Sequence, residues 1–235
     1  MIAVTWSTRT LFVLCILLGL GLAKPLHAQD AYRLGLLPSL NLNGKMSELW
    51  TWNTKLEGRQ NLREGVFTRE SKSDSRYILS DISLIVAKKV GLNSRIGMGY
   101  LLRMEGQERG HRLIQQFQVV QRFSGFRLAH RFSTDQTFQA AQSPEYRLRY
   151  RITAELPLNG DFLDRGECYL KLGQEQLHAW QNQSYTPELR FLPFFGYQWN
   201  SKLKLESGLD YRITGLFQPG TQHRFWLALN AFIKL

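Results

Sequence analysis

The stretch Pro144-Glu-Tyr-Arg-Leu-Arg-Tyr-Arg-Ile-Thr-Ala-Glu-Leu-Pro157 carries a row of basic side chains at every second position. Arg147, Arg149 and Arg151 alternate with tyrosine, leucine and isoleucine. Successive side chains of a β-strand point to opposite faces, so the stretch predicts a strand with one basic face and one apolar face. Such a strand fits a nucleic-acid-binding surface, a solvated strand of a soluble protein, or one strand of a membrane barrel.

The same alternation recurs along the rest of the chain. After residue 28 there is almost no helical periodicity, and about eleven runs of about ten residues alternate between apolar and polar positions. Runs of this kind, spread evenly over a chain, predict an all-β fold. They cover residues 34–42, 50–56, 78–86, 96–104, 113–123, 126–132, 146–152, 168–172, 189–199, 203–213 and 225–235.

The N-terminal segment has the features of a secretory signal peptide. Arg9 precedes an apolar run over residues 11–20, and the small residue Ala28 marks the expected cleavage site. A transmembrane anchor is the alternative, but the run is short for crossing a bilayer. The chain is therefore predicted to comprise a signal peptide, residues 1–28, and one domain, residues 29–235. Cys168 would then be the only cysteine left, so no intramolecular disulfide is expected.

The orientation of the strands separates a membrane barrel from a soluble one. A soluble lipocalin-like barrel turns its apolar face inward, whereas a membrane barrel turns it toward lipid. Runs of about ten residues are long for soluble strands and long enough to cross the hydrocarbon layer. Aromatic side chains near the ends of the apolar faces predict a girdle at one membrane interface, formed by Trp50, Trp52, Phe123, Phe126, Tyr197 and Trp199.

The cost of placing arginine in lipid assigns the two faces of the quoted strand. One arginine on the lipid face near mid-depth costs about 2–4 kcal/mol, so three together would cost roughly 6–12 kcal/mol. Arg147, Arg149 and Arg151 are therefore predicted to face the interior. The last run, residues 225–235, resembles the C-terminal insertion signal of bacterial outer-membrane proteins, although Leu235 replaces the customary terminal aromatic residue.

These features predict a single closed antiparallel transmembrane β-barrel of about ten to twelve strands. Twelve is preferred, because bacterial single-chain barrels have an even number of strands and about eleven runs are visible. A further strand within residues 61–76, or a first run that does not span, would restore an even number. Short connections at one end and longer ones at the other fit such a barrel, except for the long connection over residues 157–166. The longer connections are expected over residues 61–76, 137–145, 178–187 and 215–222.

Acidic and basic side chains share the polar faces and are predicted to line the interior. Paired as cross-strand ion pairs they would close it, and this is the expected arrangement because acids are scattered among the basic residues. The alternative is a narrow pore whose arginine-rich wall favours anions. The predicted lining residues are Lys55, Glu57, Arg59, Arg127, Arg131, Asp135, Arg147, Arg149, Arg151, Glu155, Glu175, Glu206, Asp210 and Arg212.

The sequence carries no motif of a nucleotide-binding, hydrolase or metal site, so neither catalysis nor a cofactor or metal is expected. His130 and His223 are the only starting points for an outer-membrane lipid-modifying enzyme, with Ser133, Ser207 and Asp135 as the nearest partners in the sequence. A lipid-modifying enzyme remains one alternative function, and a soluble periplasmic lipocalin-like binding barrel is another.

The segment Leu34-Gly-Leu-Leu-Pro-Ser-Leu-Asn-Leu-Asn43, followed by Leu49-Trp-Thr-Trp52, resembles the opening hairpin of a family of short Gram-negative outer-membrane barrels. That family is catalogued only as a domain of unknown function. The stretches Glu145-Tyr-Arg-Leu-Arg-Tyr150 and Phe194-Phe-Gly-Tyr-Gln-Trp199 are similar to its later strands. The resemblance implies a fold and an outer-membrane location but no activity. The expected partners are outer-membrane lipids and, during insertion, the barrel-assembly machinery; nucleic acid is not expected.

Overall fold

The computed structural model describes residues 30–67, 72–216 and 220–235, so the predicted signal peptide lies outside the described residues. The described residues form eleven β-strands, one for each alternating run of the sequence. None of their segments is a helix long and apolar enough to cross a membrane. The strands are β1 (Ala31–Lys45), β2 (Trp50–Val66), β3 (Lys72–Lys89), β4 (Ser94–Glu105), β5 (Glu108–Phe123), β6 (Phe126–Gln139), β7 (Glu145–Pro157), β8 (Glu167–Gln181), β9 (Ser184–Gln198), β10 (Leu203–Thr214) and β11 (Gln222–Lys234).

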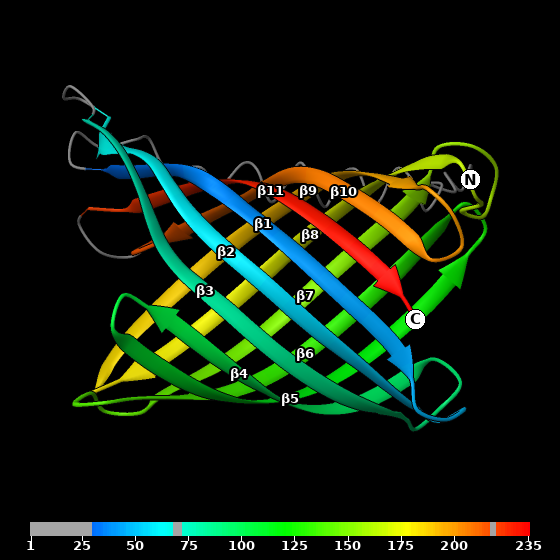
Figure 1. The fold of residues 1–235 in the computed structure, drawn as a ribbon, viewed down its shortest axis with the longest axis horizontal. Coiled ribbons are helices and arrows are strands. Elements are labelled where there is room, and N and C mark those ends of the chain that lie inside the picture. Colours follow the sequence, from blue (N-terminus) through cyan, green and yellow to red (C-terminus); the bar gives the residue numbers. More distant parts are fainter. Residues whose placement is uncertain (1–29, 68–71, 217–219) are drawn as a thin grey trace, which may run out of the picture.

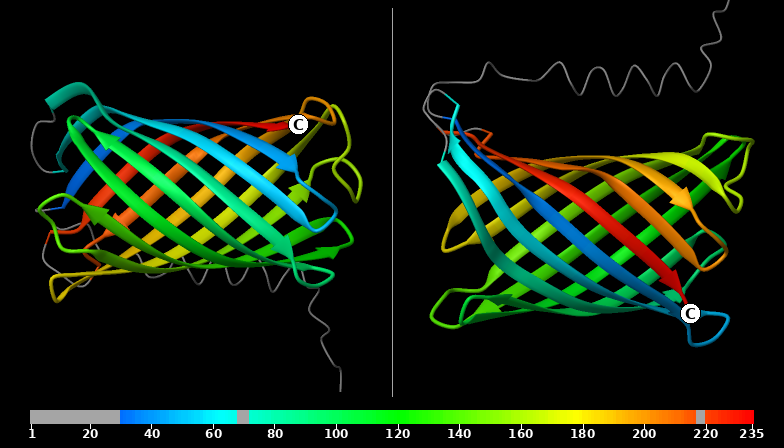
Figure 2. Two further views of the ribbon diagram at one scale, coloured as in Figure 1. Left: turned by 60° about the horizontal axis from the view of Figure 1, so that its bottom comes forward. Right: turned by 45° about the horizontal axis from the view of Figure 1, so that its top comes forward.

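The strands close into one barrel in which each strand pairs with its neighbours in the sequence, and β1 pairs with β11 (Figure 1). Two further views show the same wall of tilted strands (Figure 2). All pairs between consecutive strands are antiparallel, whereas β1 and β11 run parallel, from Ala31 opposite Gln222 to Asn43 opposite Lys234. The all-β barrel and the range of ten to twelve strands are confirmed.

Within the predicted range of ten to twelve, the sequence favours twelve strands, whereas the described residues form eleven. In the described part of residues 61–76, which leaves out 68–71, there is no additional strand: β2 and β3 extend into this segment and pair there, with Asn61 opposite Arg76. The first run is also a full member of the wall, because β1 pairs along its length with both β2 and β11. A parallel pair also satisfies the backbone hydrogen bonds of both strands, so an odd number can close without a free edge.

The parallel pair places the beginnings of β1 and β11 at one end of the barrel and their ends at the other. We call these the N-terminal end and the C-terminal end. The connections at the C-terminal end cover residues 46–49, 90–93, 124–125, 158–166 and 199–202. Those at the N-terminal end cover residues 67–71, 106–107, 140–144, 182–183 and 215–221.

The connections are less different in length at the two ends than the sequence suggests. The segment from His178 to Pro187, expected as a longer loop, is two strand ends joined by Asn182 and Gln183. Both turn residues have positive φ, 49° and 62°, as the central residues of a type I′ hairpin turn require. The long connection over residues 158–166 at the C-terminal end is present as expected.

The two faces of the wall have opposite polarity. Large apolar side chains point outward and are exposed, among them Leu84 at 49%, Met98 at 68% and Phe195 at 49%. Charged side chains point inward and are buried, including Asp135 at 1% and Glu175 at 2% exposure. This distribution is the reverse of that in a soluble protein, where charged residues are almost never fully buried and extended apolar patches are rare.

One sector of the interior is apolar. Leu37 of β1, Leu192 and Phe194 of β9, and Trp226 and Ala228 of β11 form a buried cluster there. Gly35 lies directly opposite Trp226, and a Cβ atom at Gly35 would come within 2.5 Å of the Trp226 ring. Glycine fits at this position because the Trp226 ring and the backbone carbonyl oxygen of Gln60, 2.3 Å from the same Cβ, leave no room for a side chain.

A second inward aromatic ring lies over a glycine in the same way. Tyr169 of β8 is opposite Gly196 of β9, and a Cβ at Gly196 would lie 2.0 Å from the phenol ring. The Tyr169 hydroxyl is thereby brought to Glu206 and donates a hydrogen bond of 2.7 Å. Aromatic rings over glycines help to hold the register of a curved sheet.

Candidate functional site: the charged interior

The barrel encloses a cavity of about 910 Å³ lined by residues from every strand, β1 to β11. Its lining reaches Asn53 and Phe232 toward the C-terminal end and Gln222 and Gly220 toward the N-terminal end. Residues at intermediate height, such as Ser83, line the same cavity. The cavity therefore follows the length of the barrel.

All fourteen charged residues proposed from the sequence point to the inner side of the wall. Twelve of them line the cavity, and the other two, Asp135 and Glu175, are buried against it by their arginine partners. Asp81, Arg112, Glu188 and Arg190 also belong to this interior but were not among the residues selected from the sequence. The alternation signals them: Glu188 and Arg190 flank the outward Leu189 in β9.

Asp135 of β6 is the centre of the first ion-pair cluster. Its carboxylate lies 2.5 Å from Nε of Arg147 and 3.6 Å from Nε of Arg112, and it also accepts a hydrogen bond from Arg149. The pairing of β6 with β7 brings these groups together, because Asp135 lies opposite Arg147 and Ser133 opposite Arg149. Three guanidinium groups thus share one carboxylate.

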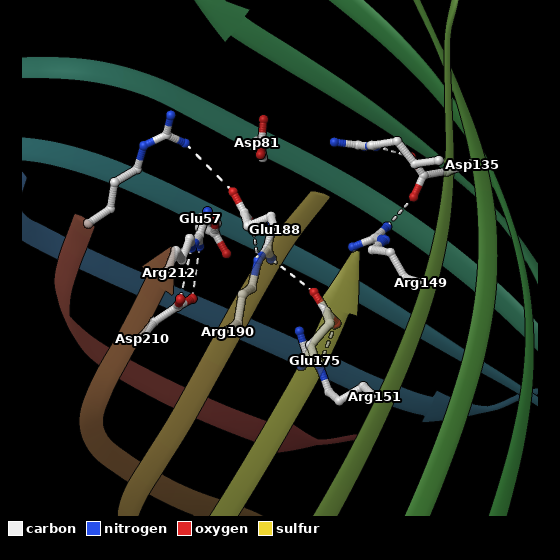
Figure 3. Close-up of polar contacts among 12 residues, drawn as sticks. Glu57, Asp81, Asp135, Arg149, Arg151, Glu175, Glu188, Arg190, Asp210 and Arg212 are labelled. Carbon is white, nitrogen blue, oxygen red and sulfur yellow. Dashed lines mark hydrogen bonds and ion pairs between the residues drawn. The ribbon is translucent and has the colours of Figure 1, made fainter. Parts of the chain in front are cut away.

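A second cluster forms a chain of ion pairs across β7, β8, β9 and β11 (Figure 3). Glu175 lies 2.6 Å from Arg151 and 3.1 Å from Arg190. Arg190 also pairs with Glu188, which lies 3.7 Å from Arg224. Each charge in this chain has at least one opposite charge as a neighbour, so burial of the chain is electrostatically compensated.

The interior surface around β10, β2 and β3 is closer to charge balance. Arg212 donates two hydrogen bonds of 2.8 Å to Asp210 within β10. In β2, Lys55 and Arg59 flank Glu57 at 2.5 and 2.9 Å. Figure 3 shows the side chains of Asp210, Arg212 and Glu57 close together.

Lysine side chains near the C-terminal end contact both carboxylates and aromatic rings. Lys171 pairs with Glu206, and its ammonium lies 4.8 Å from the centre of the Phe194 ring. Lys204 lies 3.5 Å from Glu155 and 5.0 Å from the centre of the Tyr169 ring. Contacts with ring faces stabilise a cation beyond what its carboxylate supplies.

The interior as a whole is positively charged. Among the described residues that line the cavity or are buried against it, fourteen lysines and arginines face nine carboxylates, a formal excess of five positive charges. The basic residues are Lys55, Arg59, Arg103, Arg112, Arg127, Arg131, Arg147, Arg149, Arg151, Lys171, Arg190, Lys204, Arg212 and Arg224. The acidic residues are Glu57, Asp81, Asp135, Glu145, Glu155, Glu175, Glu188, Glu206 and Asp210.

The two histidines considered for catalysis lie on the outer face. His130 is next to Tyr150, whose hydroxyl is 2.9 Å from Nδ1, while Ser133 and Asp135 point to the interior. His223 is 2.7 Å from the Tyr211 hydroxyl, also on the outer face. The described residues also contain no group of three or more His, Cys, Asp and Glu side chains that could hold a metal ion.

All six aromatic residues proposed for one girdle lie at the C-terminal end, next to three of its turns. Phe123 and Phe126 flank the turn between β5 and β6 and stack with their ring centres 4.6 Å apart. Tyr197 and Trp199 meet edge to face at 5.8 Å before β10. Trp50 and Trp52 begin β2, and the ammonium of Lys88 lies 5.5 Å from the centre of the Trp50 ring.

Comparisons with known proteins identify a family but no activity. The model of a family described as "Protein of unknown function (DUF2490)" matches residues 34–227. Among solved structures, a siderophore receptor, PirA from Pseudomonas aeruginosa, is similar at 15% identity and a TM-score of 0.31, over 77% of this chain and 35% of that one. The chain therefore spans about a third of the length of that receptor. No curated protein matches.

Proposed function

Since the chain belongs to the DUF2490 family, whose function is unknown, we propose its function from the geometry of the barrel. The protein spans the outer membrane of a Gram-negative bacterium and carries a narrow water-filled path that prefers anions. It acts as a pore and not as an enzyme.

The polarity of the wall supports the membrane part of this proposal. The outward side chains of strands around the barrel include Leu56, Ile82, Phe117 and Leu229, each at least 39% exposed. A soluble barrel would expose this surface to water, at a cost proportional to its apolar area. A lipid bilayer removes that cost, and the inward charges then stay hydrated. The lipocalin-like alternative requires the opposite orientation.

The paths of the ion pairs favour a pore over an interior closed by charges. Most pairs join residues of the same strand or of adjacent strands, as between Asp210 and Arg212 or between Asp81 and Arg103. Among the described residues, the ion pair that spans the most strands joins Glu155 and Lys204 and reaches only from β7 to β10. The pairs thus lie along the wall and do not cross between opposite walls.

The observation that carries the pore proposal is the positive excess along a cavity that follows the whole barrel. A wall with five more positive than negative charges attracts anions and repels cations within a narrow space. His130 does not offer a competing catalytic arrangement with the partners suggested by the sequence, since the barrel wall separates it from Ser133 and Asp135.

Refolded protein is expected to form channels in planar bilayers that prefer chloride over potassium. The zero-current potential in a KCl gradient measures this preference. Arg149→Gln removes one lumenal charge while Asp135 keeps Arg147 and Arg112 as partners, so it should shift that potential toward the cation side. Lys45→Gln, at the exposed end of β1, removes the same charge outside the lumen and should leave the potential nearly unchanged. A folded protein that forms no channels contradicts the pore.

The parallel closure leads to an unusual topology that can be checked in cells. Because β1 and β11 run in the same direction, Ala31 and Leu235 lie at opposite ends of the barrel. We place the C-terminal end in the periplasm. An epitope inserted just before Ala31 should therefore bind antibody in intact cells, whereas one after Leu235 should bind only after permeabilisation. Protection of both epitopes would indicate an even-stranded barrel with both termini in the periplasm.

A further inference from the structure

We propose that the wall formed by β5, β6 and β7 holds a binding site for a phosphate group, centred on Arg131. The proposal rests on the proposed function in one respect, because phosphate would reach Arg131 through the same path. It adds a specific site and a ligand class to a general preference for anions.

Arg131 differs from its neighbours in the interior. Its side chain lines the cavity, yet it forms no ion pair and no hydrogen bond with any of the described residues. Arg127, on the same face of β6 four residues earlier, pairs with Glu155 at 2.9 Å. Buried or partly buried guanidinium groups are normally paired, so an unpaired one facing a cavity is available to a ligand.

The surroundings of Arg131 are themselves basic. The register of β6 and β7 sets Arg131 directly opposite Arg151, and like charges in that arrangement repel each other. Arg151 shares Glu175 with Arg190, and Arg149 shares Asp135 with Arg147 and Arg112. The nearby carboxylates thus form ion pairs with five other guanidinium groups, and Arg131 has Glu175 only as an electrostatic neighbour, without an ion pair of its own.

Neutral donors border the same place. On β5, Gln118 lies opposite Arg131 and Gln116 lies opposite Ser133. The side chains of Gln116, Gln118 and Ser133 line the cavity beside Arg131, and none of them donates a side-chain hydrogen bond within the described residues. Amide and hydroxyl donors beside guanidinium groups form a surface that an oxygen-rich anion can contact at several points.

A phosphate group matches this surface better than a monovalent anion. It carries about 1.5 to 2 negative charges near neutral pH, enough to offset most of the charge of the facing pair Arg131 and Arg151. Its oxygens accept parallel N–H bonds from the planar guanidinium group, and such charge-assisted bonds are about twice as strong as neutral ones. Both inorganic phosphate and a phosphate monoester present this chemistry.

Calorimetric titration of the full chain in detergent micelles with inorganic phosphate tests the site. We expect saturable binding that glycerol phosphate displaces and acetate does not. Arg131→Gln should weaken phosphate binding by about tenfold to a hundredfold, the loss expected for a charge-assisted hydrogen bond. Arg131→Lys keeps the charge but not the paired donors, so its affinity for phosphate should lie between those of the wild-type chain and Arg131→Gln.

Arg127→Gln is the matched control, because it removes an inward arginine of the same strand that already has a carboxylate partner. It should bind phosphate like the wild-type chain. Equal weakening by Arg127→Gln and Arg131→Gln would overturn the site in favour of general electrostatic attraction, and absence of saturable binding by folded wild-type protein would overturn it outright. Both results leave anion conduction untouched. Phosphate binding without bilayer channels would instead uphold the site and reject the pore.

Discussion

Replacing Asp135 by asparagine is expected to destabilise the barrel by about 3–5 kcal/mol, the cost of removing one partner from a buried ion pair. Asparagine has nearly the same shape, so the change isolates the charge. Asp135 is 1% exposed and is shared by Arg112, Arg147 and Arg149. In the Asp135→Asn variant, Arg112, Arg147 and Arg149 lose the negative charge that they share, and their positive charges would repel each other. Equilibrium unfolding of the protein in lipid vesicles by denaturant measures the loss.

Two variants separate this charge effect from a general sensitivity of the barrel. Glu64→Gln removes a carboxylate that also pairs with two arginines, Arg33 and Arg76, but is 35% exposed, so it should cost no more than about 1 kcal/mol. Adding Arg149→Gln to Asp135→Asn removes one of the repelling charges and should restore part of the stability. Equal losses for the Glu64 and Asp135 variants would show that the cluster is not electrostatically special.

Phe117→Arg is expected to cost about 2–4 kcal/mol of stability in a bilayer, because it places a charge near the middle of β5 on the outer face, which the proposed membrane orientation turns toward lipid. Phe117 is 41% exposed on the outer face, whereas the adjacent Gln116 lines the cavity. Gln116→Arg adds a positive charge to the hydrated interior and should cost much less stability. Refolding yield into vesicles and denaturant unfolding of both variants measure the difference.

Phe117→Ala completes this comparison by removing the aromatic ring without adding a charge. Subtracting its effect from that of Phe117→Arg leaves the cost of the charge in lipid. The membrane orientation would be refuted if Gln116→Arg were the more damaging arginine, since the inner face would then be the apolar one. This pair of neighbours tests which side of the wall meets lipid.

The sequence predicted the faces of the strands well, and particular residues show why. The cost of three arginines in one row in lipid predicts that Arg149 and its two neighbours face the interior, and all three line the cavity. The polar composition of residues 178–187 predicts a longer loop, whereas Asn182 and Gln183 alone form a two-residue turn. The end of β8 reverses the usual polarity, with apolar Leu177 and Ala179 inside and polar Gln176 and His178 outside, so the alternation is interrupted while the backbone pairing with β9 continues.

The composition of the charged clusters could not be predicted in the same way. Nothing in the sequence indicates that Asp135 takes three arginines while Arg131 takes no carboxylate. These partners depend on the register of β5, β6 and β7, which sets Asp135 opposite Arg147 and Arg131 opposite Arg151. A shift of two residues would preserve every inward and outward face and change every partner.

The sequence by itself determined that this protein is a barrel with an apolar outer face and a charged inner face, because a period of two residues assigns each side chain to one side of the wall. Only the tertiary structure decided how the barrel closes and where its interior is left with unpaired positive charge. Closure brings β1 beside β11, strands nearly two hundred residues apart, in parallel register. The stagger between strands is a property of the whole ring, so no single run of residues encodes it.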